Sequence, residues 1–166
     1  MKYINIVLSD KDKIKEMSSL ASKIVKEHYD PILGSTQNDY MIDKFQSVTA
    51  ITKQLEQGYQ YYIVSDNDEN EVGFIDYYPR DNEMYLSKFY LLRNQRGKGI
   101  SREMLDFIIT NTKEAGLASI VLNVNKYNVI AIRAYEKLGF VKIRDEKIDI
   151  GNGYFMDDYV YQYMIQ

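Results

Sequence analysis

The segment Glu83–Phe107, EMYLSKFYLLRNQRGKGISREMLDF, contains the features that decide the fold. Its first part, Met84–Leu92, is short, apolar and aromatic, which predicts a β-strand. Its last part, Ile100–Phe107, carries apolar residues at helical spacing, which predicts the start of an α-helix. Between them, Arg93–Gly99 is a loop with two glycines and three basic residues. The segment therefore predicts a strand that enters a helix through a basic, glycine-containing loop.

A loop of this kind is suited to binding an anion. The first backbone N–H groups of a helix have no partner within the helix, and they lie at the positive end of its dipole. Gly97 and Gly99 have no side chain that would block an approaching group, and Arg96 and Lys98 add positive charge. The loop thus predicts a pyrophosphate site. The alternative is an ordinary connection whose basic side chains are solvated.

Two other nucleotide-binding loops fit this segment less well. A P-loop requires a lysine followed by Ser or Thr, whereas Gly99 follows Lys98. A dinucleotide-binding fingerprint requires a third glycine where Arg102 stands. A nucleotide or phosphate binder of another kind stays an alternative at this point.

A second motif lies downstream in Asn123–Phe140, NVNKYNVIAIRAYEKLGF. Its spaced residues are Asn128, Ala131, Tyr135, Gly139 and Phe140. Together the two motifs resemble those of the GNAT superfamily of acyl-CoA-dependent N-acetyltransferases. That family's Arg/Gln-x-x-Gly-x-Gly/Ala loop is matched by Arg96–Ser101, where Ser101 replaces the usual Gly or Ala, and its Asn-x-x-Ala-x-x-x-Tyr-x-x-x-Gly-Phe segment is matched in full. The resemblance extends from Tyr59 to Val141.

The resemblance implies acetyl-CoA as cosubstrate and assigns its binding residues. The pyrophosphate is expected on the backbone N–H groups of Arg96, Gly97, Lys98, Gly99, Ile100 and Ser101. The pantetheine arm is expected beside the strand at Leu91 and Leu92, and the N–H of Leu91 is the implied donor to the thioester oxygen. Asn128 is expected to contact the pantetheine arm. Tyr135 is expected to bind there too and to protonate the leaving thiolate, because its hydroxyl is a neutral donor at neutral pH.

The general base is where this sequence departs from the family. Many relatives carry a glutamate on the strand before the loop, and the equivalent position here is Ser87. Glu83, Asp76 and Asp157 are candidate replacements, alongside a chain of water molecules or an amine that arrives already neutral. Asp157 and Asp158 open the last strand and could meet a cationic amine. Adjacent strand residues face opposite sides, however, so at most one of them would face the substrate.

The remaining pattern predicts a mixed α/β fold. The first predicted helix begins near Lys11 and is capped by Ser9 or Asp10. Four further helices are predicted over Gln37–Phe45 with Thr36 as cap, Val48–Gln57 with Ser47 as cap, Ile100–Ala115 and Asn128–Leu138. The predicted strands are Tyr3–Leu8, Tyr59–Ser65, Glu71–Tyr78, Glu83–Leu92, Ser119–Val124, Phe140–Asp149 and Phe155–Ile165. This order is similar to the GNAT plan, which implies a mostly antiparallel central sheet of about seven strands flanked by helices.

Composition limits the functional class. The chain has 166 residues, which predicts one domain over residues 1–166. Its net charge of −3 gives no general attraction to nucleic acid or to an anionic membrane. It has no cysteine and one histidine, His28, so we expect no metal site. No apolar run approaches the roughly 20 residues of a membrane span, and the N-terminus does not fit a signal peptide, so we expect a soluble, cytoplasmic protein.

The resemblance implies an acyltransferase that moves an acetyl group from acetyl-CoA to a primary amine of a small molecule, polyamines included, by direct attack in a ternary complex. Two alternatives remain open. One is a catalytically weak module that binds or senses acyl-CoA, and the other is an acetyltransferase for protein N-termini or lysines. The sequence does not name the acceptor. Many relatives form dimers, so a homodimer also stays open.

Overall fold

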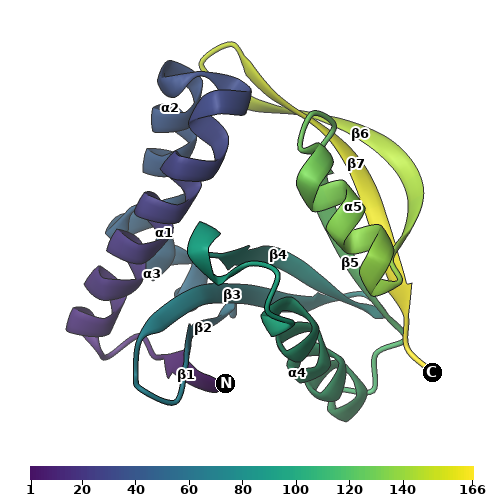
Figure 1. Ribbon diagram of the computed structural model, residues 1–166. Coiled ribbons are helices and arrows are strands. Elements are labelled where there is room, and N and C mark those ends of the chain that lie inside the picture. The colour runs from purple at the N-terminus through teal and green to yellow at the C-terminus, as the bar shows by residue number, and fades with distance from the viewer. The chain divides into compact units, whose positions relative to one another are not determined.

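The computed structural model describes all residues from 1 to 166. Figure 1 shows its strands, which are β1 (Lys2–Ile6), β2 (Gln60–Ser65), β3 (Glu71–Arg80), β4 (Glu83–Leu91), β5 (Ser119–Asn125), β6 (Val141–Gly151) and β7 (Tyr154–Met164). The helices are α1 (Lys11–Leu33), α2 (Ser35–Gln46), α3 (Val48–Glu56), α4 (Ile100–Glu114) and α5 (Val129–Leu138), with a short 3-10 turn η1 (Arg93–Gln95). The strands are hydrogen-bonded in the order β1-β2-β3-β4-β5-β7-β6. The predicted mixed α/β class and seven-stranded, mostly antiparallel sheet are confirmed.

By their contacts, the residues fall into two compact units. The first contains Met1–Tyr78 and Lys88–Glu103, and the second contains Pro79–Ser87 and Met104–Gln166. Each unit is described by itself below. The single domain expected from the length of the chain stays a prediction. No helix in the chain combines the length and the apolar character that crossing a bilayer requires.

The first unit has a core between α1 and the strands β2 and β3. One face of α1 is fully buried, and its residues are Ile14, Met17, Leu20, Ala21, Ile24 and Val25. They share a cluster with Ile63 and Phe74, which are neighbours in the antiparallel register of β2 and β3. Asp10 caps α1 by accepting a hydrogen bond from the backbone N–H of Lys13, at 3.1 Å. Of the two caps predicted for this helix, Asp10 is therefore confirmed.

The start of α2 differs from the prediction. A helix over Gln37–Phe45 with Thr36 as its cap was expected, but α2 begins at Ser35 directly after Gly34, whose φ is +81°. The buried side chain of Asn38 explains the earlier start, because it donates to the backbone oxygen of Val25 at 3.2 Å and to Asp30 at 2.8 Å. These bonds tie the first turn of α2 to α1. For α3, the predicted Ser47 cap is confirmed by the N–H of Ala50, at 3.1 Å.

A buried lysine joins α2 and α3 to the sheet. The ammonium of Lys88 on β4 donates to the backbone oxygen of Phe45 at 2.7 Å and to Gln54 on α3 at 3.3 Å, and it also contacts the hydroxyl of Tyr61. Lys88 is 5% exposed. The fully buried Asp76 lies opposite Tyr61 in the register of β2 and β3. Burial lowers the pKa of Lys88 from 10.5 to about 8, and the Asp76 carboxylate opposes this shift.

We expect Lys88→Met to flatten the alkaline stability profile. Because the folded-state pKa of Lys88 lies below its unfolded value, the unfolded chain binds more protons between about pH 8 and about pH 10.5. The wild-type free energy of unfolding should therefore gain on the order of 3 kcal/mol across this window relative to the variant. Urea denaturation over a pH series measures the difference. Parallel profiles for the two proteins would contradict a lowered pKa of Lys88 in the folded state.

The second unit is built on a parallel pair and a long hairpin. Glu83–Tyr85 of β4 pair with Ser119–Val121 of β5 in parallel, and β5 pairs with β7 in antiparallel fashion. Strands β6 and β7 form the hairpin, as Figure 1 shows, and Asn152 at its turn has a φ of +55°. Helix α5 is followed by Gly139, which has a left-handed conformation with a φ of +107°.

Candidate active site

The loop between β4 and α4 in the first unit has the geometry of an open anion cradle. Gly97 and Gly99 have φ values of +73° and +80°, a region that favours glycine. A Cβ atom built at either position would have no atom outside its chain neighbours within 4 Å. Helix α4 starts at once, since the N–H of Glu103 donates to the backbone oxygen of Gly99 at 3.3 Å. The first N–H groups of α4 therefore follow a loop with free space around its glycines.

Two basic residues of the loop contact α1. The guanidinium of Arg96 lies 3.1 Å from the Nδ1 atom of His28, and that of Arg93 lies 3.6 Å from a carboxylate oxygen of Glu27. A guanidinium can only donate, so the Nδ1 atom of His28 is the acceptor. Lys98 remains exposed, with its ammonium 3.4 Å from the side-chain oxygen of Gln95. The basic side chains of the loop thus attach it to α1. The sequence did not predict the contact between Arg96 and His28, because these residues lie 68 positions apart.

The backbone N–H groups at the end of β4 alternate in direction. The N–H of Leu92 donates to the backbone oxygen of Val72 on β3 at 2.9 Å. Since alternate N–H groups of a strand point to the same neighbour, the N–H of Leu91 points away from β3. Strands β3 and β4 approach each other closely here: a Cβ at Gly73 would lie 2.2 Å from the backbone oxygen of Tyr90. Only glycine fits at that position.

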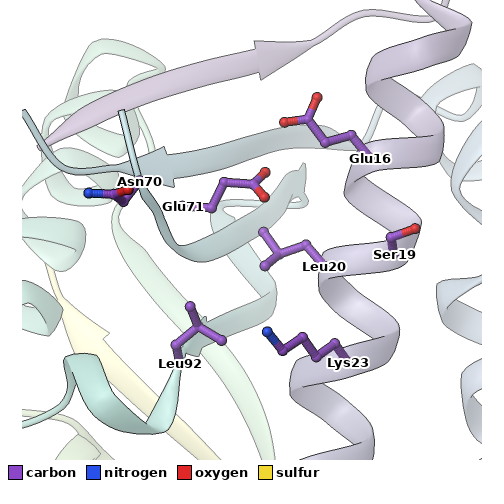
Figure 2. A pocket seen from close by; sticks show the side chains of 7 residues that line it. All are labelled: Glu16, Ser19, Leu20, Lys23, Asn70, Glu71 and Leu92. Atoms are coloured by element: carbon purple, nitrogen blue, oxygen red, sulfur yellow. The ribbon is translucent and has the colours of Figure 1, made fainter. Parts of the chain in front are cut away.

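A groove of about 570 Å³ lies beside Leu92 in the same unit (Figure 2). Its lining residues are Glu16, Ser19, Leu20, Lys23, Asn70, Glu71 and Leu92. Figure 2 shows the Lys23 side chain extending toward Leu92, and the side chains of Glu16 and Glu71 toward one another. Burial, followed by the Glu16 carboxylate, raises the pKa of Glu71. Of the site residues expected from the sequence, this groove contains only Leu92.

Helix α5 carries the two predicted site residues of the second unit. Asn128 is 3% exposed and caps α5, because its side-chain oxygen accepts a hydrogen bond from the N–H of Ala131 at 3.3 Å. Tyr135 is half-buried, and its ring meets that of Phe140 edge-on with centroids 5.7 Å apart. Seven residues make about two helical turns, so Asn128 and Tyr135 lie on one side of α5. The motif spacing therefore gives them a common face.

The carboxylates considered as a general base each have a local partner or are buried. Glu83 binds the guanidinium of Arg80 at 2.9 Å, and Asp157 binds the ammonium of Lys126 at 3.0 Å. Asp76 is fully buried with Lys88. Ser87 itself is half-buried on β4. No group of three or more His, Cys, Asp or Glu side chains is placed to hold a metal ion.

The comparisons with known proteins agree with the two motifs. The family model described as the acetyltransferase (GNAT) domain matches residues 30–155. The chain belongs to the GNAT acetyltransferase family. This match spans both the glycine loop and α5, so it covers a larger part of the chain than the motifs alone.

One curated protein is similar to part of this chain. The chain is 30% identical over 95 residues to the SPbeta prophage-derived uncharacterized N-acetyltransferase YokL of Bacillus subtilis (strain 168). That match covers 55% of this chain and 54% of YokL, so the chain spans about half the length of this curated relative.

Solved GNAT structures share the fold. PaiA N-acetyltransferase from Thermoplasma acidophilum, in complex with coenzyme A, matches with a TM-score of 0.73 and 17% identity over 99% of both chains. A GNAT family acetyltransferase from Elizabethkingia anophelis with acetyl-CoA bound matches 69% of this chain and 81% of its own, with a TM-score of 0.56 and 17% identity. At these identities the likeness is one of fold.

Proposed function

We propose that this GNAT protein transfers an acetyl group from acetyl-CoA to a primary amine of a small molecule, polyamines included. The observation that carries the proposal is the open glycine loop at the start of α4, with left-handed Gly97 and Gly99 and free space around both. Two solved proteins of the same fold bind coenzyme A or acetyl-CoA, which supports the cosubstrate. The acceptor amine attacks directly within a ternary complex.

Different residues of the chain bind the cosubstrate and catalyse the transfer. The N–H groups of Arg96–Ser101 bind the pyrophosphate, because the first N–H groups of α4 have no partner within the helix and lie at the positive end of its dipole. Leu91 and Leu92 hold the pantetheine arm along β4, and the N–H of Leu91 stabilises the developing oxyanion. On α5, Asn128 contacts the pantetheine arm, and the hydroxyl of Tyr135 gives its proton to the departing thiolate.

A second candidate, an acyl-CoA-binding module with weak turnover, is favoured by Ser87. A serine hydroxyl does not take a proton from an ammonium, and the half-buried Ser87 stands where relatives carry a glutamate. Both candidates require the same cosubstrate site. They differ in whether coenzyme A is released when an amine is added.

A thermal-shift titration followed by a thiol-release assay tests the proposal. Acetyl-CoA and CoA should raise Tm, because ligand at about 100 times Kd adds about 2.7 kcal/mol to the free energy of unfolding, whereas ATP should not. Thiol release over a panel of polyamines, amino acids and aminoglycosides then identifies the acceptor. Stabilisation without release for any amine or N-terminal peptide favours the binding module. The absence of any shift with acetyl-CoA would contradict both candidates.

A further inference from the structure

Four neighbouring strands of the second unit place one polar side chain each on the same face. Tyr85 of β4 pairs with Val121 of β5, and Asn123 lies two residues further along β5 on the same face. Asp158 of β7 pairs with Asn125 of β5 on that face, and with Glu146 of β6. The side chains of Tyr85, Asn123, Asp158 and Glu146 form what we call the four-strand network.

Hydrogen bonds connect this network. The hydroxyl of Tyr85 donates to the side-chain oxygen of Asn123 at 2.9 Å. The amide nitrogen of Asn123 donates to Asp158 at 3.3 Å and to Glu146 at 3.2 Å. One amide group thus holds two carboxylates that stand directly opposite each other in the sheet. Like charges at such positions are destabilising, and the hydrogen bonds from Asn123 offset part of this cost.

The network lies where β4 and β5 stop pairing. Their parallel pairing ends at Tyr85 and Val121, although β5 continues to Asn125. Asn123 is the next residue of β5 on the network's face beyond the last pair. Tyr85, the last residue of β4 in the parallel pairing, lies on the network's face and binds Asn123. The carboxylate of Asp158 therefore lies on the face of the sheet that carries Tyr85, near the point at which β4 and β5 separate.

The electrostatic surroundings suit Asp158 to proton transfer near neutral pH. Burial raises the pKa of Asp158 to about 6, with contributions from the carboxylates of Glu146 and Asp157, while Asn123 and Lys126 oppose the shift. Of the other charged groups nearby, Arg144 binds Glu146 at 3.4 Å, and Lys126 also binds Asp145 at 3.5 Å. The side chain of Asp158 is 2% exposed, and neither Arg144 nor Lys126 forms an ion pair with it.

We propose that Asp158 is the catalytic residue that accepts the proton of the acceptor amine, with Tyr85, Asn123 and Glu146 as positioning residues. The inference rests on the proposed function. An ammonium N–H bond breaks, a carboxyl O–H bond forms on Asp158, and the freed lone pair attacks the thioester carbon. The C–S bond then breaks, and the amine's second proton replaces the one that Tyr135 gives to the thiolate. Asp158 releases its proton to solvent after the amide has left.

The test is the pH profile of kcat/KM for the amine identified by the thiol-release assay. Wild-type activity should fall about tenfold per pH unit below about pH 6, because Asp158 must be ionised to accept a proton. Asp158→Asn should lower kcat/KM by at least about 100-fold and remove this acid limb. Glu146→Gln should move the limb to lower pH, because it removes a neighbouring negative charge. Asp106→Asn is the control, because Asp106 is an exposed carboxylate on α4 that does not contribute to the pKa shift of Asp158, and it should keep the wild-type limb.

The outcomes separate this inference from the function on which it rests. If wild-type enzyme acetylates the amine and Asp158→Asn keeps the acid limb, the inference is overturned and the function stands. If wild-type enzyme binds acetyl-CoA and acetylates no amine, both fail. If Asp158→Asn does not fold, the pH profile of Glu146→Gln is the test. A shift of its acid limb to lower pH supports the inference, and an acid limb at the wild-type pH overturns it.

Discussion

Replacing Tyr135 with phenylalanine is expected to lower kcat by about 100-fold or more, because general acid catalysis by a positioned group contributes 10²- to 10⁴-fold. The ring, its edge-on contact with Phe140 and the fold of α5 are kept, so only the hydroxyl proton is lost. The acetyl-CoA dissociation constant should change little, since the variant acts on the leaving thiolate rather than on ground-state binding. Steady-state kinetics and calorimetric titration measure the two quantities.

The matched control is Tyr127→Phe. Tyr127 precedes α5 and is 69% exposed, so the removal of its hydroxyl should leave kcat at the wild-type value. An acetyl thioester with a more acidic thiol should also reduce the difference in kcat between Tyr135→Phe and wild type, because its thiolate leaves without needing a proton to the same extent. If kcat is unchanged in Tyr135→Phe, that tyrosine has no part in the chemistry and packs on Phe140 only.

Local patterns predicted those parts of the fold that depend on neighbours in the chain. The caps Asp10 and Ser47 each depend on contacts within a few positions, and both are confirmed. The start of α2 is different. It is set by Asn38, whose side chain reaches back to Val25 in α1, so Thr36 could not serve as the cap.

In the candidate site too, features set by neighbouring residues were predictable, and contacts between distant residues were not. The glycine loop and the α5 motif are short, and their residues lie where the spacing placed them. The contact of Arg96 with His28 and the burial of Lys88 could not be read from the sequence, because each joins residues far apart in the chain. In the acidic pair, alternation predicted that at most one residue would face the substrate. The choice of Asp158 over Asp157 required the strand register and the position of Asn123.

Asn128 illustrates how one residue of a motif can have two roles. The resemblance assigns it to the pantetheine arm, and the structure shows that its side-chain oxygen caps α5. Without this cap the first turn of α5 would lose a hydrogen bond typically worth about 1 kcal/mol. The same turn fixes the direction of the helix that carries Tyr135. A substitution of Asn128 would therefore alter both binding and the placement of Tyr135, which makes it a poor test of either.

Gly99→Val is expected to weaken coenzyme A binding by at least about tenfold, which corresponds to about 1.4 kcal/mol. A valine at a φ of +80° is strained, and its side chain would project into the free space that the pyrophosphate needs to reach the N–H groups of α4. Gly116→Val is the matched control. Gly116 has a φ of +71° and equal free space, but it lies beyond the other end of α4. Both variants should lose similar stability in thermal melts, and only Gly99→Val should lose affinity in calorimetric titration with coenzyme A. If the two variants bind equally well, strain alone explains the need for glycine, and the pyrophosphate does not lie on this loop.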